Sequence, residues 1–260
     1  MANTSNSTLT TNFNVNPYYD DYDPDKGFYR ILYKPGYAVQ GRELNQMQTI
    51  LQKQIDRFGK HIFREGSIVL PGKFGIEKDV QYIKVKDVDD SNNSILVDDF
   101  LNIDLRSSVS GINAYVIDVI DGTETSTNTK TFFVRYKDSA VANTLLKTFT
   151  SGETLTSNSG NVVIVANTNA IGTGSRFIID EGVFFAKEHF IAFPAQSIIL
   201  DRYNPLPTCR VGFEIAEELI NYTDDISLLD PALEASNYAA PGADRLKLDV
   251  SLLVRDIDDN

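Results

Sequence analysis

Few side chains in this sequence could bind a transition metal or act as a strong nucleophile. The 260 residues contain one cysteine, Cys209, and two histidines, His61 and His189. A structural zinc site takes four cysteine or histidine ligands, so these three side chains cannot supply one. A single cysteine also excludes a framework of disulfide bonds. We therefore expect no zinc centre and no disulfide-stabilised fold.

The aspartates at positions 21, 23 and 25 are spaced like the first ligands of an EF-hand calcium loop. The glycine of such a loop comes one residue late, at Gly27, and the twelfth position is Leu32 where a glutamate is required. The coordination sphere therefore stays incomplete, and the aspartates are more typical of an acidic surface turn. We expect no metal and no cofactor.

Carboxylate pairs could in principle perform acid–base catalysis, and neighbouring pairs such as Glu217-Glu218 and Asp224-Asp225 occur. Glu217 and Glu218 fall in a predicted strand, where adjacent side chains point to opposite faces, which is wrong for an acid–base pair. The motifs of nucleophilic hydrolases, zinc proteases and nucleotide-binding loops are also missing from the sequence. The sequence therefore predicts that the protein is not an enzyme.

Composition restricts the possible partners. Hydrophobic residues make up 42% of the chain and the formal net charge is −12. Nucleic acids and anionic membranes attract cationic surfaces, so we expect neither as a partner. No apolar run approaches the roughly 20 residues of a membrane span, and the Asn/Ser/Thr-rich beginning does not resemble a signal peptide. We expect a chain made in the cytosol, without membrane insertion.

The strongest periodic pattern lies between Val39 and Phe63. Apolar side chains recur there at spacings of three and four: Leu44, Met47, Leu51, Ile55 and Phe58. This spacing predicts an amphipathic helix from Glu43 to Phe58, stopped by Gly59, with its apolar stripe in the core. On that basis Leu51→Ala should cost about 2–5 kcal/mol and Gln52→Ala almost nothing. The opposite, amide-rich face is equally consistent with a solvated surface and with an interface.

The remaining chain is typical of strands and turns. A short strand is predicted at Phe28–Tyr33, and Lys187-Glu188 is predicted to be a two-residue hairpin turn. Residues 1–25 are interpreted as an arm and an acidic Tyr/Asp loop, and residues 26–86 with 176–260 as the main domain. Short strands with polar turns predict that residues 87–175 form an inserted small β-barrel or sandwich. The expected fold is mainly β with one prominent amphipathic helix (α+β).

The segment NPYYDDYDPDKGFYRILYKPGYAVQGRELNQMQTILQKQIDRFGKHIFREGSIVLPG closely resembles a domain of unknown function (DUF4815-like) in virion proteins of tailed bacteriophages. The later pieces DEGVFFAKEHFIAFPAQSIILDRY, VGFEIAEELI and SLLDPALEASNYAAPGADRLKL resemble further signatures of that family. The likeness is weakest across residues 87–175. One departure is Gly41, where the family usually has alanine.

The resemblance implies a structural virion protein in the baseplate or at the attachment of tail fibres, assembled in the host cytoplasm. Its partners would be other tail, baseplate or fibre proteins and further copies of itself, with a trimer suggested by analogy alone. The alternative is a receptor-binding adhesin that contacts the host surface. The candidate interface residues are Tyr18, Tyr19, Tyr22, Asn45, Gln48 and Gln52.

Overall fold

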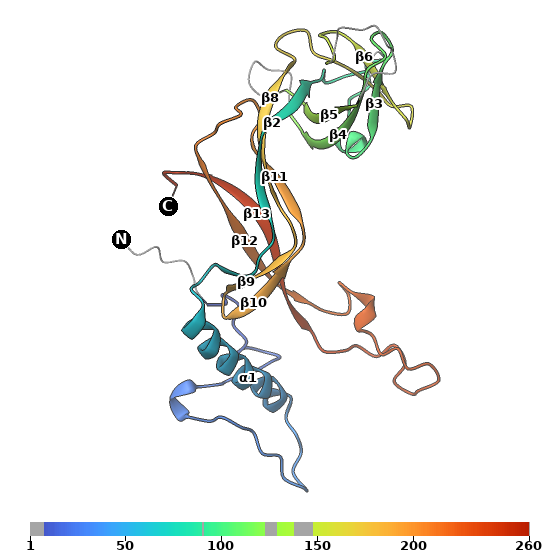
Figure 1. Cartoon of the computed structure of the whole chain (residues 1–260). Coiled ribbons are helices and arrows are strands. Elements are labelled where there is room, and N and C mark those ends of the chain that lie inside the picture. The colour runs from blue at the N-terminus through green and yellow to red at the C-terminus, as the bar shows by residue number, and fades with distance from the viewer. Residues whose placement is uncertain (1–7, 90, 123–128, 138–147, 260) are drawn as a thin grey trace.

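The computed structural model describes residues 8–89, 91–122, 129–137 and 148–259. Strands account for 41% and helix for 14%, so the expected class, mainly β with one prominent helix, is confirmed. The molecule is elongated, with α1 (Gly41–Ile62) near one end and a compact group of short strands at the other (Figure 1). The long strands between them connect the two ends (Figure 1).

Within the described residues, the strands form three antiparallel sheets. The first, in the order β1-β9-β10, comprises Ser67–Leu70, Gly182–Ala186 and His189–Phe193. The second has eight strands in the order β11-β8-β2-β5-β4-β3-β6-β7, which are Gln196–Asp201, Ile171–Ile179, Phe74–Lys84, Thr131–Lys137, Asn113–Ile120, Asp104–Ser107, Thr154–Ser157 and Val162–Ile164. The third is the hairpin of β12 (Cys209–Ile220) and β13 (Arg245–Asp256). The described part of the chain also contains short 3-10 helices at Pro24–Lys26, Val97–Phe100 and Ile226–Leu228.

Two separate groups of buried apolar side chains stabilise the two ends. Near α1, the first sheet packs on β12 and β13, and Phe184, Phe193 and Phe213 lie with ring centroids 4.7–5.8 Å apart. At the other end, the core extends from Ile83 to Ala170 in sequence and includes the fully buried Phe132 and Phe149. Its short strands continue the sheet begun by the long strands β2 and β8, which pair with each other. Most of the described part of residues 87–175 therefore lies around this second core.

Helix α1 is longer than the sequence indicated. It begins at Gly41, where the Glu43 carboxylate accepts a hydrogen bond of 2.9 Å from the backbone N–H of Gln40 and so caps the first turn. The predicted stop at Gly59 is wrong, because the helix continues to Ile62. Gly59 is needed for packing: a Cβ atom there would lie 2.5 Å from the ring of Phe185, which is fully buried in β9. A glycine lets the helix approach the sheet this closely.

Replacing Gly59 with alanine is therefore expected to destabilise the protein by about 1–3 kcal/mol, although alanine is the better helix former by about 1 kcal/mol. Gly41→Ala is the matched control, because nothing lies within 4 Å of a Cβ atom at that helix position. We expect Gly41→Ala to leave stability unchanged or raise it by up to about 1 kcal/mol. Urea denaturation followed by far-UV circular dichroism measures the free energy of unfolding of both variants. If the two substitutions changed this free energy equally, the close packing at Gly59 would be contradicted.

The orientation of α1 is the opposite of the one predicted. The apolar stripe is exposed: 57% of the Leu51 side chain and 63% of Phe58 remain accessible. The buried positions are Ile50, Asp56 and Gly59, and the half-buried ones include Asn45, Gln52 and Lys53. The prediction that the stripe is core is therefore wrong, because α1 packs on the rest of the chain through its polar side.

The strand predicted at Phe28–Tyr33 is also absent. These residues are extended but pair with no other strand within the described part of the chain, and most of their side chains are exposed. Two turns predicted from the sequence, Pro35-Gly36 and Lys187-Glu188, are both confirmed, and the second joins β9 to β10.

Candidate assembly surface

The Tyr/Asp segment that precedes α1 folds back along the polar side of the helix. The Asn45 amide donates a hydrogen bond of 3.2 Å to the backbone oxygen of Tyr18, and Thr49 donates to the Asp20 carboxylate. The Tyr18 hydroxyl donates to Asp244, just before β13, and this bond is the main cause of the raised pKa of the tyrosine. The segment thus connects the first half of α1 to the β12–β13 hairpin.

The second half of α1 is held by one turn, Lys187-Glu188. Both residues have positive φ angles, 49° and 69°, as a type I′ hairpin requires, although neither is glycine or asparagine. The Glu188 carboxylate contacts Lys53 and Lys60, and its backbone oxygen accepts a hydrogen bond of 2.6 Å from Gln52. Burial acts to raise the pKa of Glu188, but the two lysines outweigh it and lower that pKa. These contacts fix the helix on the sheet.

A second carboxylate, Glu217 of β12, binds the N-terminal segment. It accepts hydrogen bonds of 2.9 Å from the backbone N–H groups of Thr10 and Thr11, and one of 2.7 Å from the Thr11 hydroxyl. Lys187 forms an ion pair with it at 2.5 Å. Burial would raise the pKa of Glu217, yet these donors lower it to about 2. The described part of the N-terminal arm is therefore ordered against this chain itself.

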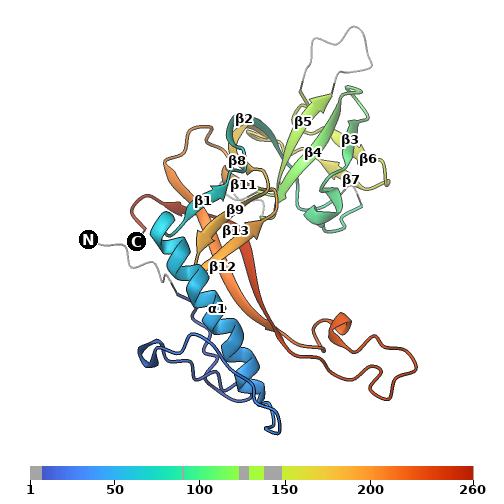
Figure 2. The same ribbon diagram turned by 60° about the horizontal axis from the view of Figure 1, so that its bottom comes forward.

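The polar side of α1 thus contacts the rest of the chain, whereas its apolar side is exposed to solvent. We call this free side the outer face of α1, defined by Leu44, Met47, Leu51, Ile55, Phe58 and Ile62, all of which are exposed. Figure 2 shows α1 at the periphery of the molecule, with the blue preceding segment beside it and β1 and β9 near its other end. A helix whose apolar side lies open in this way has the form of a binding surface for another protein.

The residues that the sequence singled out as a candidate interface are divided by this arrangement. Asn45, Gln52 and Tyr18 make hydrogen bonds within the chain. Tyr22 is half-buried, whereas Tyr19 and Gln48 are exposed. Sequence reasoning missed the apolar stripe as a surface, because an apolar stripe on a helix is usually buried in the same chain.

Further exposed apolar side chains lie in the extended segment that leads into α1. They are Phe28, Tyr29, Leu32, Tyr33, Tyr37 and Val39. The Tyr29 ring lies 5.8 Å from the guanidinium of Arg57, which places part of this segment next to the helix. The exposed apolar area at this end of the molecule therefore exceeds what α1 alone presents.

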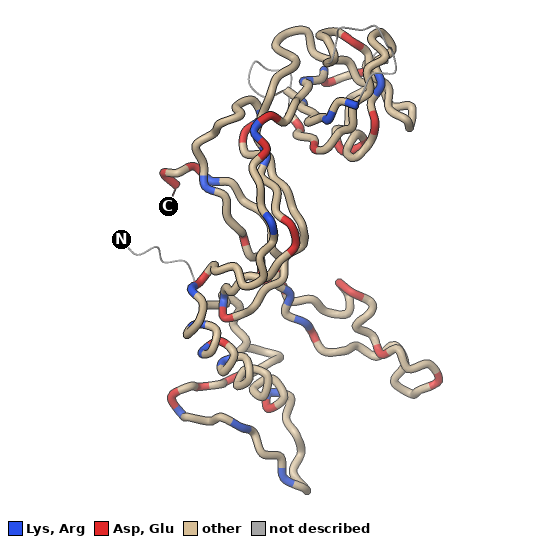
Figure 3. The backbone as a smooth tube through the Cα atoms, viewed as in Figure 1, with Lys and Arg blue, Asp and Glu red and all other residues tan. Residues whose placement is uncertain are grey.

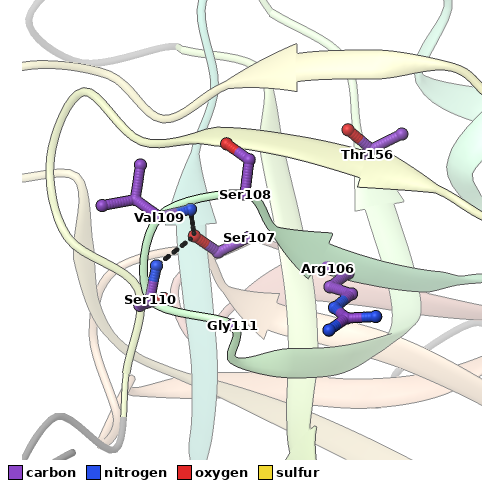
Figure 4. A pocket seen from close by; sticks show the side chains of 7 residues that line it. All are labelled: Arg106, Ser107, Ser108, Val109, Ser110, Gly111 and Thr156. Carbon is purple, nitrogen blue, oxygen red and sulfur yellow. Dashed lines mark hydrogen bonds between the residues drawn. The ribbon is translucent and has the colours of Figure 1, made fainter.

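A surface pocket lies among the short strands at the opposite end of the molecule (Figure 4). The Ser107 hydroxyl accepts hydrogen bonds of 3.1 and 3.0 Å from the backbone N–H groups of Val109 and Ser110. Arg106 lies apart from these serines, and no histidine or carboxylate lines the pocket that could act as a base (Figure 4). Ser107 therefore stabilises a turn, and this arrangement provides no general base for it.

The described residues contain no group of three or more His, Cys, Asp or Glu side chains positioned to bind a metal ion. His61 is exposed at the end of α1, and the His189 ring lies 2.7 Å from the backbone oxygen of Lys187. Lysine and arginine are scattered along the chain (Figure 3). None of the described helices is long and apolar enough to span a membrane.

The comparison with protein families gives one match. Residues 16–89 fit the family described as "Domain of unknown function (DUF4815)", which is under a third of the chain. The match covers the Tyr/Asp segment, α1, β1 and β2, and ends close to the start of the segment with its own core. No curated protein and no solved structure matches the chain.

Proposed function

We propose that this chain is a structural component of a tailed-phage particle, in the baseplate or at the attachment of the tail fibres, and that it acts through protein–protein contacts. The observation that carries the proposal is the outer face of α1, an apolar helix surface held outward by hydrogen bonds and ion pairs on the opposite side. Such a surface serves association, and the proposal includes no catalytic step. The phage setting rests on the sequence resemblance described above.

The proposed partners are other tail, baseplate or fibre proteins and further copies of this chain. The proposed location is the virion, with assembly in the host cytoplasm. A net charge of −12 is unfavourable for binding to nucleic acid, which agrees with a role in the tail.

The experiment is to identify and locate the chain in purified particles of its phage. Quantitative mass spectrometry should find it in stoichiometric amounts, and cryo-electron microscopy should place it in the baseplate or at the fibre junction. A phage carrying Leu51→Glu should yield fewer complete particles, whereas Val109→Glu should assemble normally, because Val109 is an exposed residue far from α1. Absence of the chain from purified particles would overturn the proposal.

The adhesin alternative has one supporting observation. Residues 87–175 lie mostly at the end of the molecule opposite α1, where a small subdomain could reach outward (Figure 1). An antibody against this subdomain distinguishes the two roles. Gold labelling at the outer tip of the fibres, together with neutralisation of adsorption, would favour adhesion, and labelling at an inner ring would favour the structural role.

A further inference from the structure

We propose that the outer face of α1 packs against the same face of α1 in a second copy of this chain. The proposal deepens the proposed assembly function, on which it rests for its biological setting, by naming the partner of that surface. Four observations lead to it: the spacing of the stripe, the uncharged residues beside it, the identity of the available helices and the accessible area of the chain.

The spacing of the stripe suits another helix. Leu44, Met47 and Leu51 recur eleven residues later as Ile55, Phe58 and Ile62. Eleven residues in three turns give 3.67 residues per turn, close to the 3.6 of a straight helix, so the stripe runs nearly parallel to the axis. From Leu44 to Ile62 the stripe is about 27 Å long. A narrow, straight, apolar seam of this kind is typical of helix-to-helix packing.

The residues that border the stripe favour a copy of the same chain. At 100° per residue, the nearest neighbours on its two sides are Gln48 and Gln54, both exposed and uncharged. The lysines and carboxylates of the helix that form ion pairs, Lys53, Asp56 and Lys60, are used on the other side. Two identical copies can therefore meet along a seam whose immediate edges are uncharged, although each chain carries a net charge of −12.

Within the described residues, α1 is the only α-helix. A second copy therefore offers one element with a matching apolar seam, and that element is α1 itself. Contact between identical patches on two copies is the usual arrangement in symmetric homo-oligomers.

The chain exposes a large surface for its mass. The chain exposes 16830 Å². A compact monomer of 29.0 kDa exposes about 11,000 Å². The larger area agrees with the elongated shape of the molecule (Figure 1) and with the many exposed apolar side chains of α1 and of the segment before it. Obligate homo-oligomers bury about 2,000–5,000 Å² in total, and such an interface needs exposed apolar side chains like those of the outer face of α1 and of the segment before it.

The test is sedimentation equilibrium of the purified full chain over a range of concentrations. We expect a mass that is a multiple of 29.0 kDa. The double variant Leu51→Glu/Ile55→Glu should associate at least about tenfold more weakly. Each of the two copies would then bury two carboxylates in an apolar interface and bring them close to those of the other copy. Val109→Glu, which adds an acidic group at an exposed apolar position far from α1, should associate like the wild type.

A second measurement keeps the test decisive if the charged variant folds poorly. In the background Cys209→Ser, the single variant Leu51→Cys should form a disulfide between two chains on mild oxidation, whereas Val109→Cys should not. A wild-type chain that stays at 29.0 kDa, or an oligomer unaffected by the double variant and without a Leu51→Cys cross-link, would overturn the inference. Self-association of the pure chain is independent of its presence in phage particles, so each proposal can fail without the other.

Discussion

Ile50→Ala is expected to destabilise the folded chain by about 2–5 kcal/mol, whereas Leu51→Ala should change the stability of a single chain by less than about 0.5 kcal/mol. The two neighbours have similar size but opposite environments. Ile50 is 5% exposed and Leu51 is 57% exposed. Alanine at position 50 leaves a cavity under the helix, and alanine at position 51 only trims a side chain in solvent.

Urea denaturation measures this difference, at a dilution at which sedimentation shows single chains. The low concentration matters because association would add stability to the wild type alone. A loss of several kcal/mol from Leu51→Ala under these conditions would mean that the stripe is packed within its own chain, and the orientation of α1 described above would be wrong.

The second large effect is expected at Glu217. Replacing it with alanine should cost about 3–5 kcal/mol, because its side chain is only 4% exposed and its removal leaves Lys187 and two backbone N–H groups without their acceptor. We also expect the N-terminal segment to become sensitive to proteases. The matched control is Glu218→Ala, since that carboxylate is half exposed and lies 4.0 Å from Lys247, where an ion pair contributes little.

The contribution of Glu217 should depend on pH. Its pKa falls from 4.5 to about 2 on folding, so its ionised form stabilises the native state above about pH 4.5. That stability is lost as the pH falls through about 2, when the carboxyl becomes protonated in the folded chain as well. The difference in stability between the wild type and Glu217→Gln, measured by denaturation at a series of pH values, should therefore shrink between pH 5 and pH 2. A constant difference would contradict the assigned role.

The sequence predicted where α1 lies but not which way it faces. A period of three and four shows that one side of a helix is apolar, and both a core and an interface between chains would produce it. The choice depends on Glu188, Asp20 and Tyr18, which hold the polar side of α1 against the chain. These contacts join residues far apart in the sequence, so no local sequence pattern predicts them.

Other differences between the predicted and the observed structure also arise from residues that are distant in the sequence. Phe28–Tyr33 has the composition of a strand, but a strand also needs a partner edge, and the described structure offers none there. From the local sequence, Gly59 is predicted to end the helix. In the structure it lets α1 pack closely against the ring of Phe185, which lies more than a hundred residues away in the sequence. The Lys187-Glu188 turn and the strands β12 and β13 were predictable because their signals, two-residue spacing and strict alternation, are local.

The central claim is that α1 turns its polar side inward and offers its apolar side to another copy. Hydroxyl-radical footprinting with mass spectrometry tests it most directly, by comparing dilute single chains with the associated protein. We predict that Leu51 and Phe58 are modified readily in single chains, that Ile50 is protected, and that association protects Leu51 and Phe58 as well. Protection of Leu51 and Phe58 already in single chains, or unchanged modification on association, would contradict the claim.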